Sequence, residues 1–235
     1  MTNATENNAQ ALGNGRTALS VVRIGDTVRR TPALNDEFAR ALLLHLEREG
    51  FEGAPRFLGI DDGGRRIFSY LTGEVPGDLG HFDDAVLVGA ARLIRRYHDA
   101  TASLFAGTAW HDTGLEVACH NDLSPCNTVF RMGAPFGLID FDAAAPGTRR
   151  WDVGYAAWLW LDLENSEYSH EEQVRRLKLF VNAYGPPLET RQVALAALDR
   201  QALLEFEGAR TGKNDLAQWA SVSRRTTSEL AELLR

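Results

Sequence analysis

The sequence predicts an α+β protein, with a small antiparallel sheet in front and a larger, mostly helical portion behind. Three observations lead to this prediction. Short β-branched runs separated by Gly and Asp turns fill residues 12–71, which is typical of hairpins. From residue 81 onward apolar side chains recur at helical spacing, which is typical of amphipathic helices. Residues 72–80 are rich in Gly and Pro and predict a linker between the two portions.

The front portion starts with a polar tail and continues as two hairpins around one helix. Residues 1–11 are rich in Asn and poor in large apolar side chains, so we expect them to be disordered. Hairpins are predicted over 20–30 and 56–71, each with a turn that contains Asp and Gly. Between them, Asn35 or Asp36 can cap a helix that ends before the second hairpin.

The back portion is predicted to consist of helices with one short strand pair between them. Asp83 or Asp84 caps the first helix. The strand pair is expected where residues 127–130 meet residues 136–139. Further helical patterns cover residues 151–163, 171–184, 189–206 and 215–233. In the last of these we expect one apolar stripe, formed by Leu216, Trp219, Val222, Leu230 and Leu233.

Composition excludes several classes of partner. The net charge of −7 leaves no basic surface in bulk for DNA or RNA, so no nucleic-acid partner is expected. No apolar run reaches the ~20 residues that span a bilayer, and the polar start of the chain does not resemble a signal peptide. Cys119 and Cys126 are too few for a secreted disulfide scaffold, which favours a reducing, cytoplasmic location. The sequence does not indicate an oligomeric state.

One polar segment carries the chemistry. It contains His120-x-Asp122-x-x-x-x-Asn127 and, after the predicted strand pair, Ile139-Asp140-Phe141-Asp142. Apolar runs lead into and out of each cluster, so the polar side chains should emerge together at strand ends. Phosphoryl transfer needs a carboxylate that orients the acceptor's proton, and oxygen ligands that hold Mg²⁺ against the phosphates. A single Asp would ordinarily be a turn residue or a cap, and it is the joint spacing that favours a kinase.

This segment resembles the signature of the aminoglycoside phosphotransferase and choline kinase family, whose members are distant relatives of the protein kinases. The resemblance implies a bilobal protein-kinase-like fold. Its N-lobe would cover residues 12–71, the linker residues 72–80, and the helical C-lobe residues 81–235. It also implies an enzyme that moves the γ-phosphoryl group of ATP or GTP, with Mg²⁺, to a hydroxyl of a small molecule.

The resemblance also assigns roles to residues of the motif. It implies that Asp122 is the catalytic base and that Asn127 and Asp140 are metal ligands. His120 would be a structural brace of the loop. Asp152, at the start of the following helix, would tie that helix to the loop. Asp142 is either an auxiliary metal ligand or the cap of a turn.

The nucleotide side of the site is expected in the front portion, where the family places a cation under the phosphates. In Thr27-Val28-Arg29-Arg30 the apolar Val28 should face the core, so alternation along the strand favours Arg29, with Arg30 as the second candidate. Glu37 could pair with that cation, or could merely favour the helix dipole.

Two further contacts with the nucleotide are implied by analogy with the family. Gly13 and Gly15 could belong to a loop over the phosphates, although glycines of a flexible tail explain them nearly as well. The base should hydrogen-bond to backbone groups near Ser69, Tyr70 and Leu71.

The acceptor is less well defined by the sequence. Family members take cationic amino sugars or amino alcohols, and an acidic stretch follows the predicted helix that is rich in Trp; its members are Asp162, Glu164, Glu167, Glu171 and Glu172. This stretch could bind an ammonium group, or it could be a solvated helix end above a Trp-filled core. Two other functions stay open: a non-catalytic nucleotide-binding module and a divergent protein kinase. No long activation segment follows Asp142, which argues against the second of these.

Overall fold

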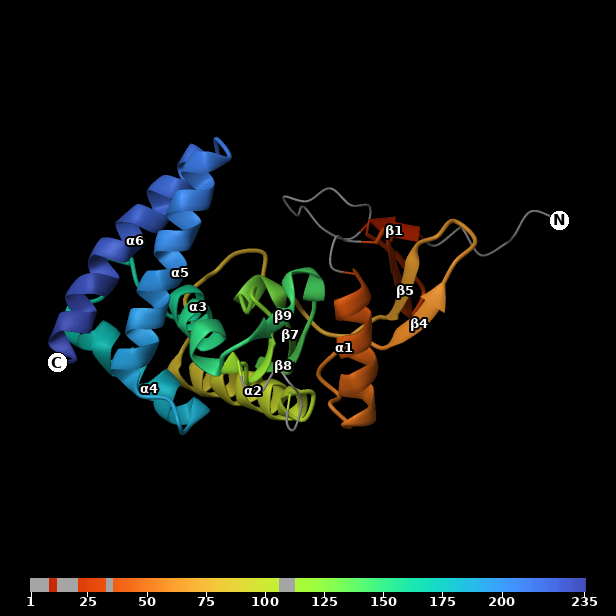
Figure 1. Ribbon diagram of the computed structural model, residues 1–235, viewed down its shortest axis with the longest axis horizontal. Helices are drawn as coiled ribbons and strands as arrows, with labels where there is room; N and C mark the ends of the chain where they lie inside the picture. Colours follow the sequence, from red (N-terminus) through yellow and green to blue (C-terminus); the bar gives the residue numbers. More distant parts are fainter. Residues whose placement is uncertain (1–8, 12–20, 33–35, 106–112) are drawn as a thin grey trace.

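A twisted antiparallel sheet and a helical region lie side by side, joined by an extended linker (Figure 1). The computed structural model describes residues 9–11, 21–32, 36–105 and 113–235. Gly13 and Gly15, proposed as part of a phosphate-covering loop, lie outside the described residues. The combination of a small antiparallel sheet with a mostly helical second part confirms the predicted α+β fold class.

The sheet has the strand order β1-β2-β3-β5-β4, and every neighbouring pair is antiparallel. Its strands are β1 (Ala9–Ala11), β2 (Val22–Ile24), β3 (Thr27–Arg30), β4 (Phe57–Ile60) and β5 (Arg66–Ser69). The two predicted hairpins are therefore present. Residues 9–11 were expected to be part of a disordered tail and instead pair with β2 as an edge strand. A segment of Ala and Gln has little strand preference of its own, so pairing with β2 decides its conformation.

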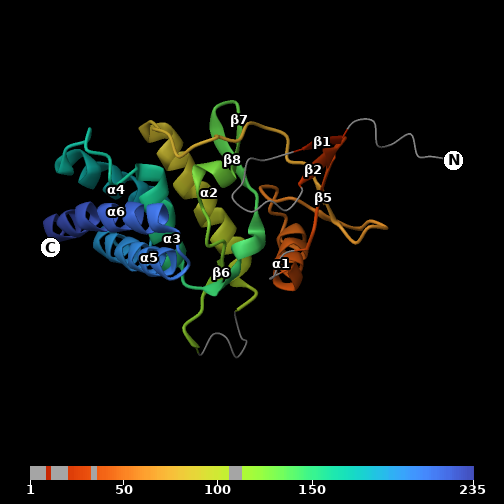
Figure 2. The same ribbon diagram turned by 90° about the horizontal axis from the view of Figure 1, so that it is seen from above.

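Helix α1 (Asp36–Arg48) lies beside the sheet, on the side toward the helical region (Figure 2). Its buried residues Leu42, Leu43 and Leu46 join the main hydrophobic core. At its start, the carboxylate of Asp36 forms an ion pair with Arg66 of β5 at 2.6 Å. The helix is thereby fixed to the sheet at one end and to the core along one face.

The linker is held against the helical region by a backbone bridge. Glu74 N–H donates to Phe130 O at 3.0 Å, and Phe130 N–H donates to Glu74 O at 2.7 Å. The neighbouring Gly73 has φ +154°, and a Cβ atom there would overlap the carbonyl oxygen of Phe130. Only glycine therefore allows the linker to approach this strand so closely.

The described residues of the second part form the α-helices α2 (Asp84–Ala102), α3 (Arg149–Leu161), α4 (His170–Tyr184), α5 (Thr190–Arg210) and α6 (Asn214–Leu233). The predicted cap of α2 is Asp83, whose Oδ1 accepts from Val86 N–H at 2.9 Å. Helices α2 and α3 contribute the largest buried side chains, among them Tyr97, Trp158 and Trp160. Helices α5 and α6 form an antiparallel pair at the end of the molecule farthest from the sheet (Figure 1).

Two short strand pairs lie between α2 and α3. The predicted pair is present as β7 (Thr128–Arg131) with β8 (Ala134–Leu138). A second pair, β6 (Val117–Cys119) with β9 (Ala145–Gly147), was not predicted. These strands have three residues each and depend on tertiary contacts, because β6 is buried throughout. Together the two pairs carry the polar segment singled out in the sequence.

The predicted apolar stripe of α6 is wrong in two of its members. Val222 and Leu233 are 44% and 60% exposed, whereas Ala220, Ser223, Thr227, Leu230 and Ala231 are buried. Small and hydroxyl-bearing residues fill the interface because α5 approaches closely there: Gln201 Nε2 donates to Thr227 Oγ1 at 2.9 Å. Hydrophobicity alone therefore misplaced the buried face.

Among the helices of the described residues, none has both the length and the apolar character that crossing a bilayer requires.

Candidate active site

Asp122 and Asn127 lie in contact in the loop between β6 and β7. Asn127 Nδ2 donates to the carboxylate Oδ2 of Asp122 at 2.8 Å and to its backbone O at 3.0 Å. The 3₁₀ turn η2 (Pro125–Asn127) makes this possible, because it folds the chain back toward Asp122. The amide of Asn127 is thereby oriented, and its Oδ1 has no hydrogen-bond donor among the described residues.

Asp140 follows β8 and lies beside the same loop. Its neighbour Ile139 donates its N–H to Asn127 O at 2.9 Å, which aligns the two motifs. Asp140 has φ +64°, a left-handed conformation that Asp tolerates better than most residues, at the start of the turn η3 (Phe141–Ala143). His120 is buried and its Nε2 lies 3.0 Å from Ile139 O, so the imidazole connects the loop to the Asp140 segment.

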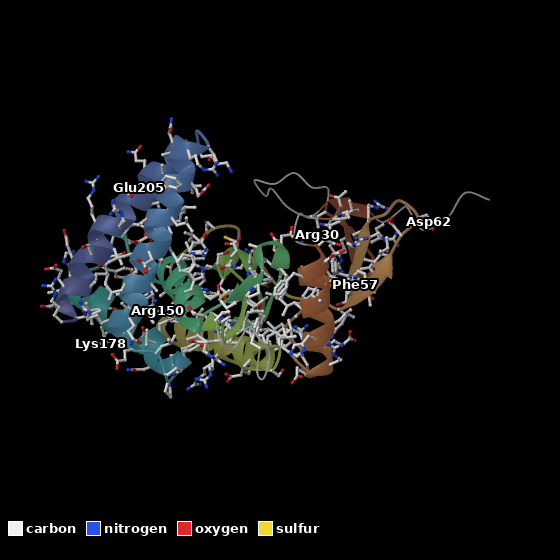
Figure 3. All side chains as sticks on the ribbon, in the orientation of Figure 1. Arg30, Phe57, Asp62, Arg150, Lys178 and Glu205 are labelled. Carbon is white, nitrogen blue, oxygen red and sulfur yellow. The ribbon has the colours of Figure 1, made fainter. Side chains whose placement is uncertain are left out.

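Of the two arginines considered for the phosphates, Arg30 lies against the motif and Arg29 does not. Arg30 Nη1 is 3.2 Å from Asp140 Oδ1, and Nη2 forms an ion pair with Asp142. Arg29 instead lies 3.7 Å from Asp61 in the turn after β4. Figure 3 shows Arg30 where the sheet approaches the helical region. The alternation argument assumed that core and cleft lie on opposite faces of β3, whereas Val28 and Arg30 share a face.

Asp152 sits at the centre of the loop's backbone contacts. It is fully buried in the first turn of α3, and its two oxygens accept from His120 N–H at 2.7 Å and Asn121 N–H at 2.8 Å. His98 of α2 completes its shell, with Nε2 at 3.0 Å from Oδ2. The carboxylate thus joins α2, α3 and the start of the loop.

Burial acts on the pKa of Asp122 in the loop and on that of Asp152 in α3, but the two pKa values shift in opposite directions. Burial raises the pKa of Asp122 above its ordinary value, against the opposing effects of His120 and of the hydrogen bond from Asn127. Burial would also raise the pKa of Asp152, but the contacts with His98 and His120 outweigh it and lower that pKa. Asp152 is therefore held as a carboxylate, whereas Asp122 is a stronger base than an exposed Asp.

On the nucleotide side, the three backbone N–H groups predicted near the base differ in whether a described residue accepts from them. Ser69 N–H and Tyr70 N–H are engaged, with Arg56 O at 2.9 Å and Asp26 O at 2.8 Å. Leu71 N–H has no hydrogen-bond acceptor among the described residues. The candidate base-binding group of the predicted trio is therefore Leu71.

Glu37 does not pair with either arginine. It is exposed in the first turn of α1, and no salt bridge of the described residues includes it. The carboxylates that contact Arg30 come instead from the Asp140 and Asp142 segment.

The acidic stretch after α3 is largely engaged within the protein. Glu164 accepts from the indole N–H of Trp158 at 3.0 Å and from that of Trp219. Glu172 pairs with Arg175 at 2.7 Å, and Asp162 accepts from Asn165 at 3.0 Å. Burial raises the pKa of Glu164, against the hydrogen bonds from the two indoles. These contacts are those of a helix end packed on a Trp-filled core.

Residues that the sequence interpretation did not single out support the loop from behind. Trp160 Nε1 donates to Leu123 O at 3.1 Å, and Arg200 of α5 contacts Asn121 at 2.9 Å. His98 had a detectable signal, because a polar residue there continues the buried stripe of α2. Arg200 had none, because nothing in its neighbourhood in sequence distinguishes it from other helical arginines.

The oxygen atoms gathered here fit a hard divalent cation. Asn127 Oδ1, Asp140 and Asp142 are the oxygen donors that Mg²⁺ prefers, and a few protein ligands suffice when phosphates and water supply the rest. In the part of the chain that the structure describes, no three His, Cys, Asp or Glu side chains gather into a metal-binding group. Cys119 is buried, Cys126 is half-buried, and neither forms a disulfide.

Comparisons with known proteins agree on the family and on the type of fold. A profile described as the phosphotransferase enzyme family matches residues 108–195, which contain the whole motif. The trifolitoxin immunity protein of Rhizobium leguminosarum bv. trifolii is 31% identical over 191 residues, which cover 74% of this chain and 72% of that protein.

Two solved structures show the same fold at low identity. A choline/ethanolamine kinase family protein from Mesorhizobium loti aligns with a TM-score of 0.64 at 16% identity, over 97% of this chain and 90% of that one. The aminoglycoside 2'-phosphotransferase-IIIa, solved as its GDP complex, aligns with a TM-score of 0.58 at 16% identity, over 94% and 92%.

Proposed function

Since the chain belongs to the phosphotransferase enzyme family, we propose that it transfers the γ-phosphoryl group of ATP or GTP to a hydroxyl of a small molecule. The observation that carries this proposal is the convergence of Asp122, Asn127 and Asp140 on one side of the loop, with Arg30 beside them. These are a base, two oxygen ligands and a cation, which phosphoryl transfer requires.

In this proposal each side chain of the site has a task. Asn127 occupies Oδ2 of Asp122, which leaves Oδ1 to accept the proton of the acceptor hydroxyl. Asn127 Oδ1 and the Asp140 carboxylate would hold Mg²⁺, which when bound neutralises charge on the phosphates. Arg30, which contacts Asp140, would bind the α- and β-phosphates, and Leu71 N–H would donate to the edge of the base. His120 and Asp152 brace the loop and take no part in proton transfer.

The relatives define which acceptors to test. Those of known fold include kinases of choline or ethanolamine type and aminoglycoside phosphotransferases, so amino alcohols and amino sugars come first. The relative at 31% identity is named for immunity to trifolitoxin, which favours a protective role and adds trifolitoxin itself to the panel. The engaged acidic stretch gives no independent support to a cationic acceptor.

A coupled assay of ADP or GDP release, with Mg²⁺ and this acceptor panel, tests the proposal. We expect turnover that falls by about 10²–10⁴-fold in Asp122→Asn, because the base is lost while nucleotide binding persists. Asp84→Asn is the matched control, since Asp84 lies exposed at the start of α2 and, among the described residues, forms an ion pair with Arg175 of α4. If Asp122→Asn binds ATP and turns over as fast as the control, Asp122 is not the base. Binding without turnover on any acceptor would favour the non-catalytic module.

A further inference from the structure

Arg200 forms hydrogen bonds with Asn121, the residue that precedes the proposed base Asp122. It comes from the middle of α5, a helix that otherwise packs on α3 and α6, and its guanidinium makes two hydrogen bonds to a single residue. Nη2 donates to Asn121 O at 2.9 Å, and Nη1 donates to Asn121 Oδ1 at 3.2 Å. The same guanidinium lies over the rings of Tyr155 and Trp151 of α3, at 4.1 and 4.7 Å from their centroids.

The contacts of Asn121 hold an unusual backbone conformation. Its φ is +64°, in the left-handed region, which costs energy for residues with a Cβ atom, although less for Asn than for most. Its polar groups are all engaged: N–H donates to Asp152 at 2.8 Å, Nδ2 donates to Ala143 O at 2.9 Å, and Oδ1 also accepts from Trp151 Nε1 at 3.1 Å. Because these contacts fix the conformation of Asn121, they also fix the direction in which the chain continues to Asp122.

We propose that Arg200 is a positioning residue for phosphoryl transfer: it holds Asn121 in the left-handed conformation and thereby aims the carboxylate of Asp122. This inference rests on the proposed function, since Asp122 is a base only there. Arginine suits the task because its planar fork presents two donors in a fixed geometry, whereas a lysine ammonium can satisfy only one acceptor with comparable direction. The aromatic faces of Trp151 and Tyr155 fix the plane of the fork.

A purely structural role for Arg200, as a fastener of α5 to α3, predicts a different result. Its loss would then lower the melting temperature and leave the rate per folded molecule unchanged. A positioning role requires the rate to fall while nucleotide affinity stays the same, because Arg30, Asn127 and Asp140 do not touch Arg200.

Arg200→Met separates the two roles. Methionine keeps an apolar stem against Trp151 and Tyr155 and removes both hydrogen bonds. Using Mg·ATP or Mg·GTP and the acceptor that gives turnover, we expect kcat to fall by about tenfold or more, with KM for the nucleotide within about twofold of the wild type. Arg200→Lys should recover part of kcat. The control is Arg191→Met, on the exposed first turn of the same helix, which should leave both parameters unchanged.

Asn121→Gly tests whether Arg200 acts through Asn121. Glycine accepts the left-handed conformation without strain and removes the Oδ1 contact, although the backbone O contact remains. In this background Arg200→Met should lower kcat by a smaller factor than in the wild type. Equal factors in both backgrounds would mean that Arg200 acts by another route.

Hydrogen exchange makes the inference testable even without turnover. Arg200→Met should speed amide exchange in the peptide that covers residues 118–127, whereas Arg191→Met should not. If the wild type turns over no nucleotide, the proposed function is wrong. Hydrogen exchange in Arg200→Met would then be the one test of whether Arg200 positions the loop. Unchanged exchange and unchanged kcat in Arg200→Met, or a fall in melting temperature with no change in kcat, would overturn the inference.

Discussion

Arg30 balances the charge of the candidate site. Its guanidinium contacts Asp140 and Asp142, two carboxylates that would otherwise repel each other at the mouth of the loop. A triphosphate brings further negative charge to this place, so the cation is positioned to bind phosphate oxygens through its planar fork. Arg29 has no comparable role, because it contacts the turn of the second hairpin through Asp61.

We predict that Arg30→Ala weakens binding of Mg·ATP or Mg·GTP by about tenfold or more, since a charge-assisted hydrogen bond contributes about 1.5–3 kcal/mol. Isothermal titration calorimetry checks the affinity. Arg29→Ala is the control on the neighbouring position and should bind nucleotide as the wild type does. Loss of affinity in Arg29→Ala with no loss in Arg30→Ala would reverse the assignment.

Asp152 makes the unfolding free energy of the protein depend on pH in the acidic range. Its pKa in the folded state lies below the unfolded value of about 4. The carboxylate therefore stabilises the fold fully above about pH 4, and this stabilisation is lost as the pH falls through the folded pKa. Replacement by Asn leaves buried donors poorly paired, so Asp152→Asn should cost about 3–5 kcal/mol at neutral pH.

Urea unfolding at a series of pH values measures this difference. The gap in unfolding free energy between the wild type and Asp152→Asn should be constant near neutrality and shrink below about pH 4. A gap that widens on acidification would contradict the sign of the shift.

The residues predictable from the sequence are those with fixed spacing in one segment. Asp122, Asn127 and Asp140 were identified together because a single loop and hairpin carry them. The choice between Arg29 and Arg30 failed as a sequence argument, since alternation gives two faces and does not say which one the catalytic segment approaches. Arg200 was beyond prediction, because its partner lies 79 positions away in sequence.

At the scale of an element, α3 couples helix capping to the loop. Thr148 caps the helix, with Oγ1 accepting from Trp151 N–H at 3.2 Å, and the first turn then carries Asp152 and Trp151, which both bind the loop. Helix α4 has a comparable cap: Ser169 Oγ accepts from Glu172 N–H at 3.2 Å. The first turn of α4, unlike that of α3, carries none of the residues described above as binding the loop. The two caps allow stability and function to be separated.

We predict that Thr148→Ala and Ser169→Ala each lower the unfolding free energy by about 1 kcal/mol, through the loss of the cap. Only Thr148→Ala should also slow phosphoryl transfer, because fraying of α3 releases the donors and acceptors that hold the loop. Urea unfolding and the coupled assay report the two effects. Equal losses of turnover in both variants would show that capping of α3 has no special connection with the loop.

The elements with a long apolar pattern, or with a clear turn next to them, were predictable. Short strands without such a turn were not. The hairpin of β2 and β3 and the helix after Asp83 follow from turns, caps and spacing. Strands β1, β6 and β9 have three residues each, too few for a pattern to emerge. The buried face of α6 was misplaced because Ser223 and Thr227 are buried with their hydroxyls bonded, which a hydrophobic stripe cannot reveal.

At the scale of the whole molecule, the linker is one of the connections between the sheet and the helical region. Its backbone bridge to β7 holds the chain just after Leu71, whose free N–H is the proposed contact with the base. Arg131 adds a second link, with Nε donating to Thr72 O at 2.8 Å. The phosphates of the nucleotide would lie at Arg30 and Asp140, which contact each other, and its base at Leu71, so the position of the linker should affect its affinity.

Gly73→Ala tests this dependence on the linker. A Cβ atom at position 73 would overlap Phe130 O and a methyl group of Val129, and φ +154° is unfavourable for alanine. We predict a loss of about 2 kcal/mol or more in unfolding free energy, together with weaker binding of nucleotide, because the linker must move off β7.

Gly77→Ala is the matched control in the same linker, since a Cβ there meets open space and φ is not positive. It should leave both urea unfolding and calorimetric affinity near wild-type values. If Gly73→Ala binds nucleotide as tightly as Gly77→Ala, the bridge to β7 does not govern how the two parts close on the nucleotide.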